Sequence, residues 1–130
     1  MDWQNNVSFG KLTFIGLVRH DVRFAMRRIM YIEFKGTGIS GPGRIGWVER
    51  TKSGRSFLYR GKRLQKTESG YKYNCIDVET GDHYWVSGPK KRGGDTMYGG
   101  LVEIDDDARG EYWLKIRNRP QDAHLTKYRG

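Results

Sequence analysis

The chain has 130 residues and a formal net charge of +9, which fits one domain with one core and favours an anionic partner. Its one cysteine, Cys75, excludes an internal disulfide framework and a cysteine-rich zinc site, and it points to the reducing cytoplasm. No apolar run approaches the roughly 20 residues that a membrane span needs, so no membrane span is predicted.

The first segment, residues 1–29, has apolar residues at the spacing of three and four that is typical of a helix. They are Leu12, Ile15, Val18, Val22, Met26 and Ile29, with arginines between them. One interpretation is a basic amphipathic helix that lies on a membrane surface or on a partner. The other is an N-terminal extension ahead of a domain that starts at Met30.

Residues 30–117 are expected to form the domain, because short alternating segments and glycine turns follow one another about every ten residues. The expected strands are "YIEFK", "GRIGWVER", "SFLYRG", "KRLQKT", "YKYNCIDV", "HYWVSG" and "GLVEI". Gly61 suggests a bulge or tight bend between two of them. This pattern predicts a mainly β protein with a small antiparallel SH3-like barrel, and an OB-like barrel is the alternative.

The segment "DDDARGEYWLKIR" is expected to close the domain as one α-helix, capped by Asp105 or Asp106. Tyr112, Trp113 and Ile116 would form its core-facing stripe. At least two of the tryptophans Trp47, Trp85 and Trp113 are expected in one cluster. Residues 118–130, which follow the helix and contain Pro120, are predicted to be a flexible tail.

The loop "SGPKKRGGDTMYGG" resembles a phosphate-binding loop only superficially, because the lysine and hydroxyl that follow the last glycine of such a loop are missing. Its cations, Lys90, Lys91 and Arg92, either contact the phosphates of a nucleic acid or form a solvated connection. Both interpretations stay open.

Cys75 and His83 are near in sequence, but a hairpin with Thr80 and Gly81 at its turn places them on opposite faces. Cys75 is therefore expected to be a buried structural residue. The histidines His20, His83 and His124 lie far apart in the chain, and no ligand spacing is present. We predict no catalytic residue, cofactor or metal.

The stretch from Arg44 to Lys72 is the strongest functional signal, with nine Lys/Arg and two Glu, a local charge of +7. By contrast, residues 73–117 carry six Lys/Arg and nine Asp/Glu, a charge of −3. Cations that follow a phosphate chain beside aromatic rings are typical of single-stranded nucleic-acid binding. The candidate binding residues are Arg50, Lys52, Arg55, Arg60, Lys62, Arg63, Lys90, Lys91, Arg92 and Tyr59. The alternative is that the aromatic residues are core and the cations form a solvated face.

The blocks "YRGK", "DVETG" and "SGPKK", within Met30 to Arg117, resemble a family of short uncharacterised bacterial proteins. Some members of that family carry the label of deoxyxylulose-phosphate synthase. That enzyme class resembles transketolase, needs several hundred residues and binds thiamine diphosphate through a Gly-Asp-Gly motif. This chain has "GDH" at Gly81–His83 and is far shorter, so the residues do not support the label.

These observations favour a non-enzymatic cytoplasmic binding module whose partner is single-stranded RNA or DNA, or an acidic protein. An interaction or accessory subunit that uses Trp47, Trp85 or Tyr98 as anchors is the alternative. A small enzyme with a tyrosine, His83 or Asp77 in an acid–base role is the weakest interpretation, because no convergent group of such residues is evident.

Overall fold

The computed structural model describes residues 24–36, 38, 40–68, 70, 72–96 and 98–130. Its first six strands are β1 (Phe24–Gly36), β2 (Gly43–Thr51), β3 (Ser56–Tyr59), β4 (Lys62–Lys66), β5 (Cys75–Asp77) and β6 (His83–Ser87). The C-terminal part contains β7 (Leu101–Ile104), α1 (Asp106–Glu111), the π-helix η1 (Tyr112–Ile116), the 3-10 turn η2 (Pro120–Asp122) and β8 (Lys127–Arg129).

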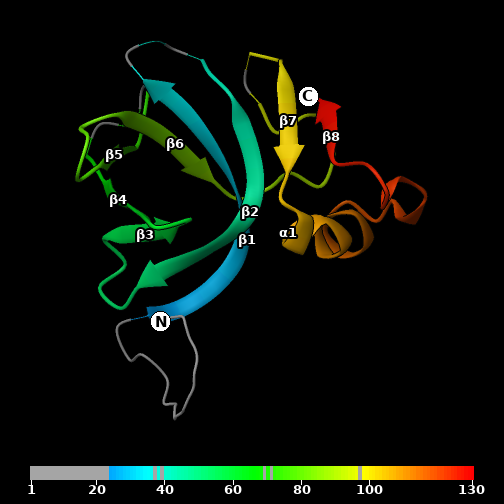
Figure 1. Cartoon of the computed structure of the whole chain (residues 1–130), viewed down its shortest axis with the longest axis horizontal. Helices are drawn as coiled ribbons and strands as arrows, with labels where there is room; N and C mark the ends of the chain where they lie inside the picture. Colours follow the sequence, from blue (N-terminus) through cyan, green and yellow to red (C-terminus); the bar gives the residue numbers. More distant parts are fainter. Residues whose placement is uncertain (1–23, 37, 39, 69, 71, 97) are drawn as a thin grey trace.

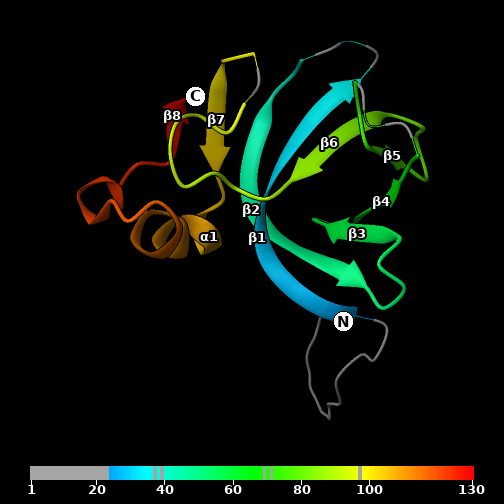
Figure 2. The ribbon, with the colours of Figure 1, turned by 180° about the vertical axis from the view of Figure 1, so that it is seen from behind.

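The first six strands form a closed antiparallel barrel in the order β1-β6-β5-β4-β3-β2, because β1 also pairs with β2. Outside the barrel, β7 pairs in parallel with β2, and β8 pairs antiparallel with β7. These two strands and α1 lie together on one side of β1 and β2 (Figures 1 and 2). The predicted small antiparallel barrel with one C-terminal α-helix is confirmed.

Strand β1 is buried on both faces, because it separates two hydrophobic cores. Its residues Met30 and Ile32 point into the barrel, where they meet Val48, Leu64 and Val86 among others. The residues between them face the opposite way. Ile29 and Tyr31 pack in a second core, under α1 and η1, whose members are Ile29, Tyr31, Ile45, Val102, Ile104, Ala108, Tyr112 and Trp113.

The expected boundary at Met30 lies inside β1, which begins at Phe24. The helical interpretation is therefore wrong for residues 24–29. Arg27 pairs with Glu49 and Arg28 with Val48 in the ladder to β2, and this strand pairing overrides the helical spacing of the apolar residues. The rest of the predicted helix, within residues 1–23, lies outside the described residues.

The expected flexible tail is also wrong, because residues 118–130 return to the second core. The indole nitrogen of Trp113 donates a 3.0 Å hydrogen bond to the Leu125 carbonyl, and Leu125 and Tyr128 pack against that core. The chain then joins the sheet as β8. Pro120 begins the short turn η2 on this return path and does not start a loose end.

The predicted closing helix is present, but it changes to a π-helix at Tyr112. The predicted core stripe is confirmed: Tyr112 and Trp113 are buried, and Ile116 packs against the same core. Trp47 and Trp85 also pack there, so all three tryptophans meet in one cluster.

Candidate functional site

The hairpin between β3 and β4 turns through Arg60 and Gly61, which have φ angles of 49° and 81°. Tyr59 and Lys62 on either side are paired, so the connection has two residues, and both adopt the left-handed conformation. The tight bend expected at Gly61 is thus a hairpin turn. An arginine in this conformation costs about 1–2 kcal/mol, and this strain makes Arg60 a candidate functional residue.

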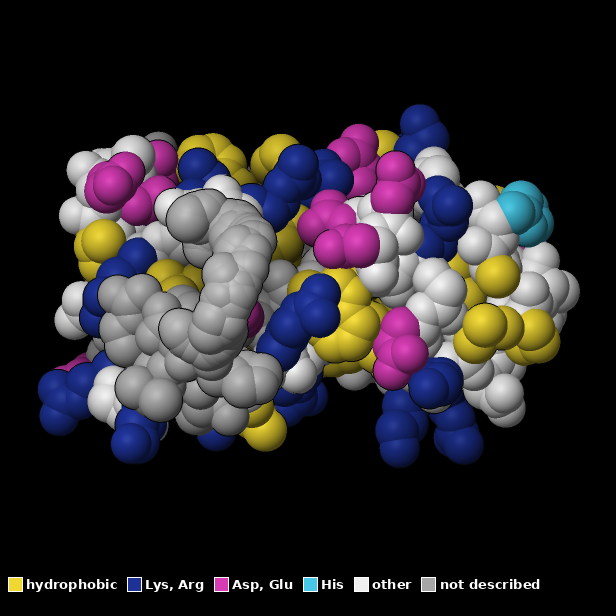
Figure 3. Space-filling view, turned by 60° about the horizontal axis from the view of Figure 1, so that its bottom comes forward, with side chains coloured by type: hydrophobic (Ala, Val, Ile, Leu, Met, Phe, Trp, Pro, Cys, Tyr) yellow, Lys and Arg dark blue, Asp and Glu magenta, His cyan; other side chains and the backbone are white. Residues whose placement is uncertain are grey.

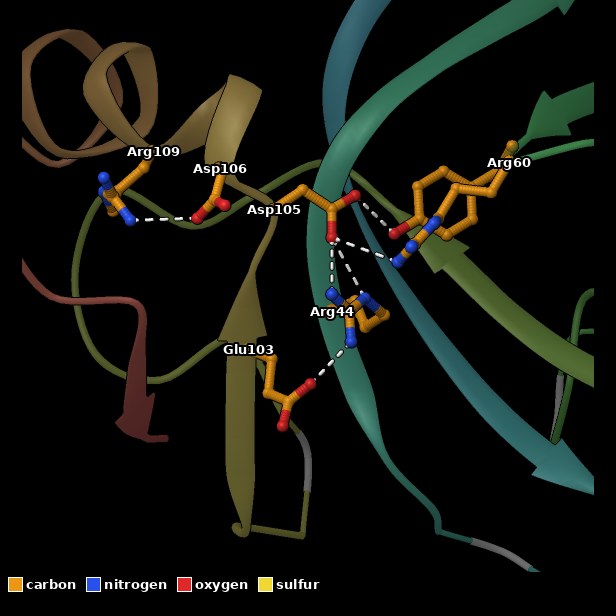
Figure 4. A network of polar contacts seen from close by, with 7 residues as sticks. Arg44, Arg60, Glu103, Asp105, Asp106 and Arg109 are labelled. Carbon is orange, nitrogen blue, oxygen red and sulfur yellow. Dashed lines mark hydrogen bonds and ion pairs between the residues drawn. The ribbon is translucent and has the colours of Figure 1, made fainter.

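Asp105 lies at the centre of a polar network that includes Arg60 (Figure 4). Its Oδ1 accepts hydrogen bonds from Arg44 Nε at 3.0 Å and Nη2 at 2.7 Å, and lies 3.5 Å from Arg60 Nη1. Its Oδ2 accepts a 2.6 Å bond from the Tyr59 hydroxyl. The remaining Arg44 nitrogen, Nη1, contacts Glu103 at 2.5 Å. The network therefore holds Arg44 through three nitrogens, whereas Arg60 has a single 3.5 Å ion pair and most of its donors available.

This network explains why Asp105 does not cap α1 as predicted. Asp105 occupies the N-cap position, but its side chain makes no capping hydrogen bond because it points back to β2 and β3. Gly46 leaves the space for it. A Cβ atom at Gly46 would overlap the Asp105 carboxylate and would lie 2.6 Å from Tyr59 Cε1.

One end of the barrel opens into an aromatic hollow of about 370 Å³, which we call the aromatic mouth. Its apolar lining consists of Ile32, Phe34, Pro42, Tyr59 and Tyr84, and its rim carries Arg44, Arg60 and Lys62. Phe34 is 38% exposed and meets Tyr84 edge to face, with ring centroids 5.4 Å apart. Flat rings surrounded by cations suit a planar group that is attached to an anion.

A second hollow, the outer groove, has a volume of about 520 Å³ and lies over the outer face of β1 to β4. A cross-strand row of Arg27, Glu49, Leu58 and Arg63 forms its floor, and Trp47 and Arg60 flank it. The Arg27 guanidinium lies 4.3 Å from the centroid of the Trp47 ring, which favours cation–π contact. Arg60 thus borders both the aromatic mouth and the outer groove.

An acidic strip adjoins these cations. Asp105, Asp106 and Asp107 line a third hollow together with Arg44 and Arg60. In the view of Figure 3, acidic and basic side chains lie next to one another with hydrophobic side chains between them. The surface is therefore of mixed charge at α1 and basic along β3 and β4.

The predicted cations of the Arg44–Lys72 stretch do not all lie on one surface. Lys52 and Arg55 are exposed in the β2–β3 connection, and Lys62 and Arg63 are exposed on β4. Arg50 differs, because it shares the barrel-facing side of β2 with Val48 and its Nε atom is buried without a hydrogen-bond partner.

The prediction that the Tyr59 ring stacks on a base is wrong. The ring is 5% exposed and belongs to the barrel core. Phe57 is buried in the same core. The core interpretation is right for these two aromatic residues, because both have the side-chain direction that alternation assigns to the inside of the barrel. Tyr59 contributes its buried ring to the wall of the aromatic mouth instead.

The loop that carries Lys90, Lys91 and Arg92 is fastened to the C-terminal segment by Asp95. Asp95 Oδ1 accepts a 2.7 Å bond from the Lys90 backbone nitrogen, and its Oδ2 accepts bonds from the hydroxyls of Tyr112 and Tyr128. The three cations are exposed, and none of them lines the aromatic mouth or the outer groove.

Cys75 is fully buried, and burial raises the pKa of its thiol to about 11. It pairs with Tyr84 while Ile76 pairs with His83, so Cys75 and His83 lie on opposite faces as predicted. The pairing register differs by two residues from the expected one, because Asp77 Oδ1 accepts the Glu79 and Thr80 amides and widens the connection. Within the described residues, no His, Cys, Asp or Glu side chains form a group of three that could hold a metal.

The sequence analysis gave no site role to Phe34, Tyr84, Arg44 and Asp105, nor to Arg27, Glu49 and Leu58 of the outer groove. Phe34 and Tyr84 share no sequence signal, because only the pairing of β1 with β6 brings them together. The position of Asp105 before the helix predicted a capping residue, so its contacts with Arg44 and Tyr59 were not expected. Arg44 opens the +7 stretch, so its charge was the one signal available.

No protein-family model, curated protein or solved structure matches this chain. The resemblance to the family of short bacterial proteins therefore stays a prediction. None of the helices in the described part of the chain is long and apolar enough to cross a bilayer.

Proposed function

We propose that the protein is a non-enzymatic binding module that engages single-stranded RNA or DNA around Arg60. The observation that carries the proposal is the position of Arg60 between an aromatic mouth and an outer groove. A base that leaves the stack would enter the mouth beside Phe34, and the neighbouring phosphates would meet the cations of the rim and the groove. Stacking and phosphate contacts of this kind bind single strands without reading their sequence.

Arg60 has donors to spare for a phosphate. Its side chain is 58% exposed and makes one 3.5 Å ion pair with Asp105, whereas a guanidinium carries five N–H donors. Lys62 is exposed on the same rim. Arg44 already contacts Asp105 and Glu103 through all three of its guanidinium nitrogens, so its first role is to position Asp105.

An acidic protein partner, or a wider interaction role, is the second candidate. The mixed charge of the surface favours it, because Asp106 and Asp107 would repel phosphates that pass over α1. A protein partner could instead place its own cations there and an apolar side chain against Trp47. Such a partner would bind in the outer groove and would make no contact with the aromatic mouth.

Fluorescence anisotropy with labelled poly(dT) and poly(rU), measured over a range of salt concentrations, tests the first candidate. Replacing Arg60 and Lys62 with Gln should reduce the slope of log K against log salt by about 1.4, because each phosphate of a single strand that a cation neutralises adds about 0.7 to that slope. The matched control removes two exposed cations elsewhere, Lys115 and Lys127, and should leave the slope unchanged. Absence of binding at low salt, or equal slopes for both variants, would leave the protein-partner candidate.

A further inference from the structure

We propose that a separate hollow on the outer face of β1 and β6 is a binding site for a small aromatic monoanion. Its volume is about 210 Å³. The lining residues used in the argument are Glu33, Lys35, Lys72, Trp85, Lys90 and Tyr98. This site is independent of the aromatic mouth, which opens on the other side of β1.

The inner wall of this hollow is a buried ion pair. Glu33 and Lys35 have side chains that are 4% and 5% exposed, and Lys35 Nζ lies 2.8 Å from Glu33 Oε2. The Tyr31 hydroxyl donates a 2.6 Å bond to Oε1, and the Gly41 amide donates a 3.1 Å bond to Oε2. Removing two charges from water is costly, and such pairs contribute little stability. The pair is satisfied within the protein and forms a fixed polar wall of the hollow.

A second carboxylate, Asp95, also lies at the hollow and is satisfied by the protein. It accepts bonds from the Lys90 amide and from the hydroxyls of Tyr112 and Tyr128. Because both carboxylates already have donors, neither requires a cationic ligand. The Asp95 contact also fixes the backbone of Lys90 at the edge of the hollow.

The ammonium groups of Lys72 and Lys90 are the ones available to a ligand. Both residues are exposed, and neither ammonium is joined to another described residue by a hydrogen bond or ion pair. The opposite charges of Glu33 and Lys35 cancel, and the negative charge of Asp95 offsets the positive charge of one of the two remaining lysines. The hollow therefore has a net charge of +1, which favours a ligand with one negative charge.

Two aromatic side chains define the rest of the ligand. Trp85 packs against the second core and is half-buried, whereas Tyr98 is 60% exposed with Lys35 Nζ 5.6 Å from its ring centroid. The volume of about 210 Å³ is smaller than the usual site for a drug-sized ligand. One ring with one acidic group fills this space, with the ring on Trp85 and the acid at Lys72 and Lys90.

Titration calorimetry of the full chain with four probes tests the site. Benzoate has the ring and the charge, phenol has the ring without the charge, acetate has the charge without the ring, and benzylamine has the opposite charge. We expect benzoate to bind at least about tenfold more tightly than each of the others. Equal affinities for benzoate and phenol, or for benzoate and acetate, would overturn the proposal.

Variants then locate the binding. Replacing Lys72 and Lys90 with Gln should lower the affinity for benzoate by at least about tenfold and leave the affinity for phenol unchanged. The matched control, Lys66 and Lys91 to Gln, removes two exposed cations that do not line the hollow, and should retain benzoate binding. The indole NMR signal that disappears in Trp85→Phe should shift with benzoate in the native chain. A shift confined to another indole, or an equal weakening in both lysine variants, would overturn the site.

Discussion

The Tyr59 hydroxyl donates a 2.6 Å hydrogen bond to Asp105 Oδ2, a contact that spans 46 positions of the chain. Tyr59 belongs to the barrel core, and Asp105 directly precedes the helix that covers the second core. The bond therefore links the two halves of the molecule at the point where Arg44 and Arg60 also meet Asp105. Changes at Asp105 should affect both stability and the arrangement of Arg60.

Replacing Asp105 with Ala should reduce the free energy of unfolding by about 2–3 kcal/mol. The substitution leaves the Tyr59 hydroxyl and the Arg44 guanidinium without their acceptor, and hydrogen bonds to a charged group are among the stronger ones. Urea unfolding measures the change. Asp106→Ala is the control, because that side chain is 90% exposed, and its effect should stay within about 0.5 kcal/mol. Equal effects would mean that the network contributes nothing.

Gly46→Ala should also destabilise the protein, by about 1–3 kcal/mol. The added methyl would lie 2.6 Å from Tyr59 Cε1 and would overlap the Asp105 carboxylate, so the ring or the carboxylate must move. Gly70→Ala provides the comparison, since nothing lies within 4 Å of a Cβ there. Thermal unfolding measures both variants. Equal unfolding midpoints would contradict the close packing at Gly46.

Buried tyrosines should make stability fall at high pH. Burial, and then the bond to Asp105, raises the pKa of Tyr59 to about 12, from an ordinary value of 10.0. A folded pKa above the unfolded one means that the stabilisation is intact below pH 10 and is lost as the pH rises from about 10 through 12. Burial also raises the pKa of Tyr128 to about 12 and that of Tyr112 above its ordinary value.

The phenolate absorbance of the native protein measures these ionisations directly. Tyr59→Phe should remove one tyrosine from the upper step of the titration and leave the lower step unchanged. A Tyr59→Phe titration that loses its amplitude in the lower step would show that Tyr59 ionises like an exposed phenol.

The N-terminal boundary gives a prediction opposite to the one drawn from the sequence. A domain boundary at Met30 implies that a chain beginning there folds with nearly unchanged stability. Ile29 is 4% exposed in the second core, and residues from Phe24 onward pair with β2. Starting at Met30 should therefore cost more than about 2 kcal/mol relative to a chain that starts at Phe24, measured by urea unfolding. Similar stabilities would restore the boundary at Met30.

Alternation and turn residues predicted the fold well where each contact is local. The strands around Gly61 and Gly81, the buried Cys75 and the core-facing Trp113 all follow from the spacing of nearby residues. The prediction was wrong where one segment packs against both hydrophobic cores. Strand β1 is buried on both faces, so alternation indicated its second half, "YIEFK", whereas the apolar residues of its first half have the spacing of a helix. The SH3-like or OB-like assignment of the barrel stays a prediction.

The candidate site was harder to predict, because it depends on contacts between distant segments. Charge density indicated Arg60 and Lys62, but nothing local indicates that Phe34 and Tyr84 share the mouth beside them. Tyr59 illustrates a second difficulty. From the sequence alone, a ring flanked by cations can either stack on a ligand or pack inside the barrel. Alternation places Phe57 and Tyr59 on one face, which kept the core interpretation open beside the binding one.

Phe34→Leu separates stacking from phosphate contact at the aromatic mouth. Phe34 is 38% exposed and offers the accessible ring of the mouth, so a stacked base should lose about 1–3 kcal/mol of binding free energy when the ring is removed. The slope of log K against log salt should stay the same, because no cation changes. Tyr98→Leu, which removes an exposed ring outside the mouth, should leave oligonucleotide affinity unaltered. If both variants bind as the native chain does while Arg60 and Lys62 still set the salt slope, the nucleic acid contacts the cations without a base in the mouth.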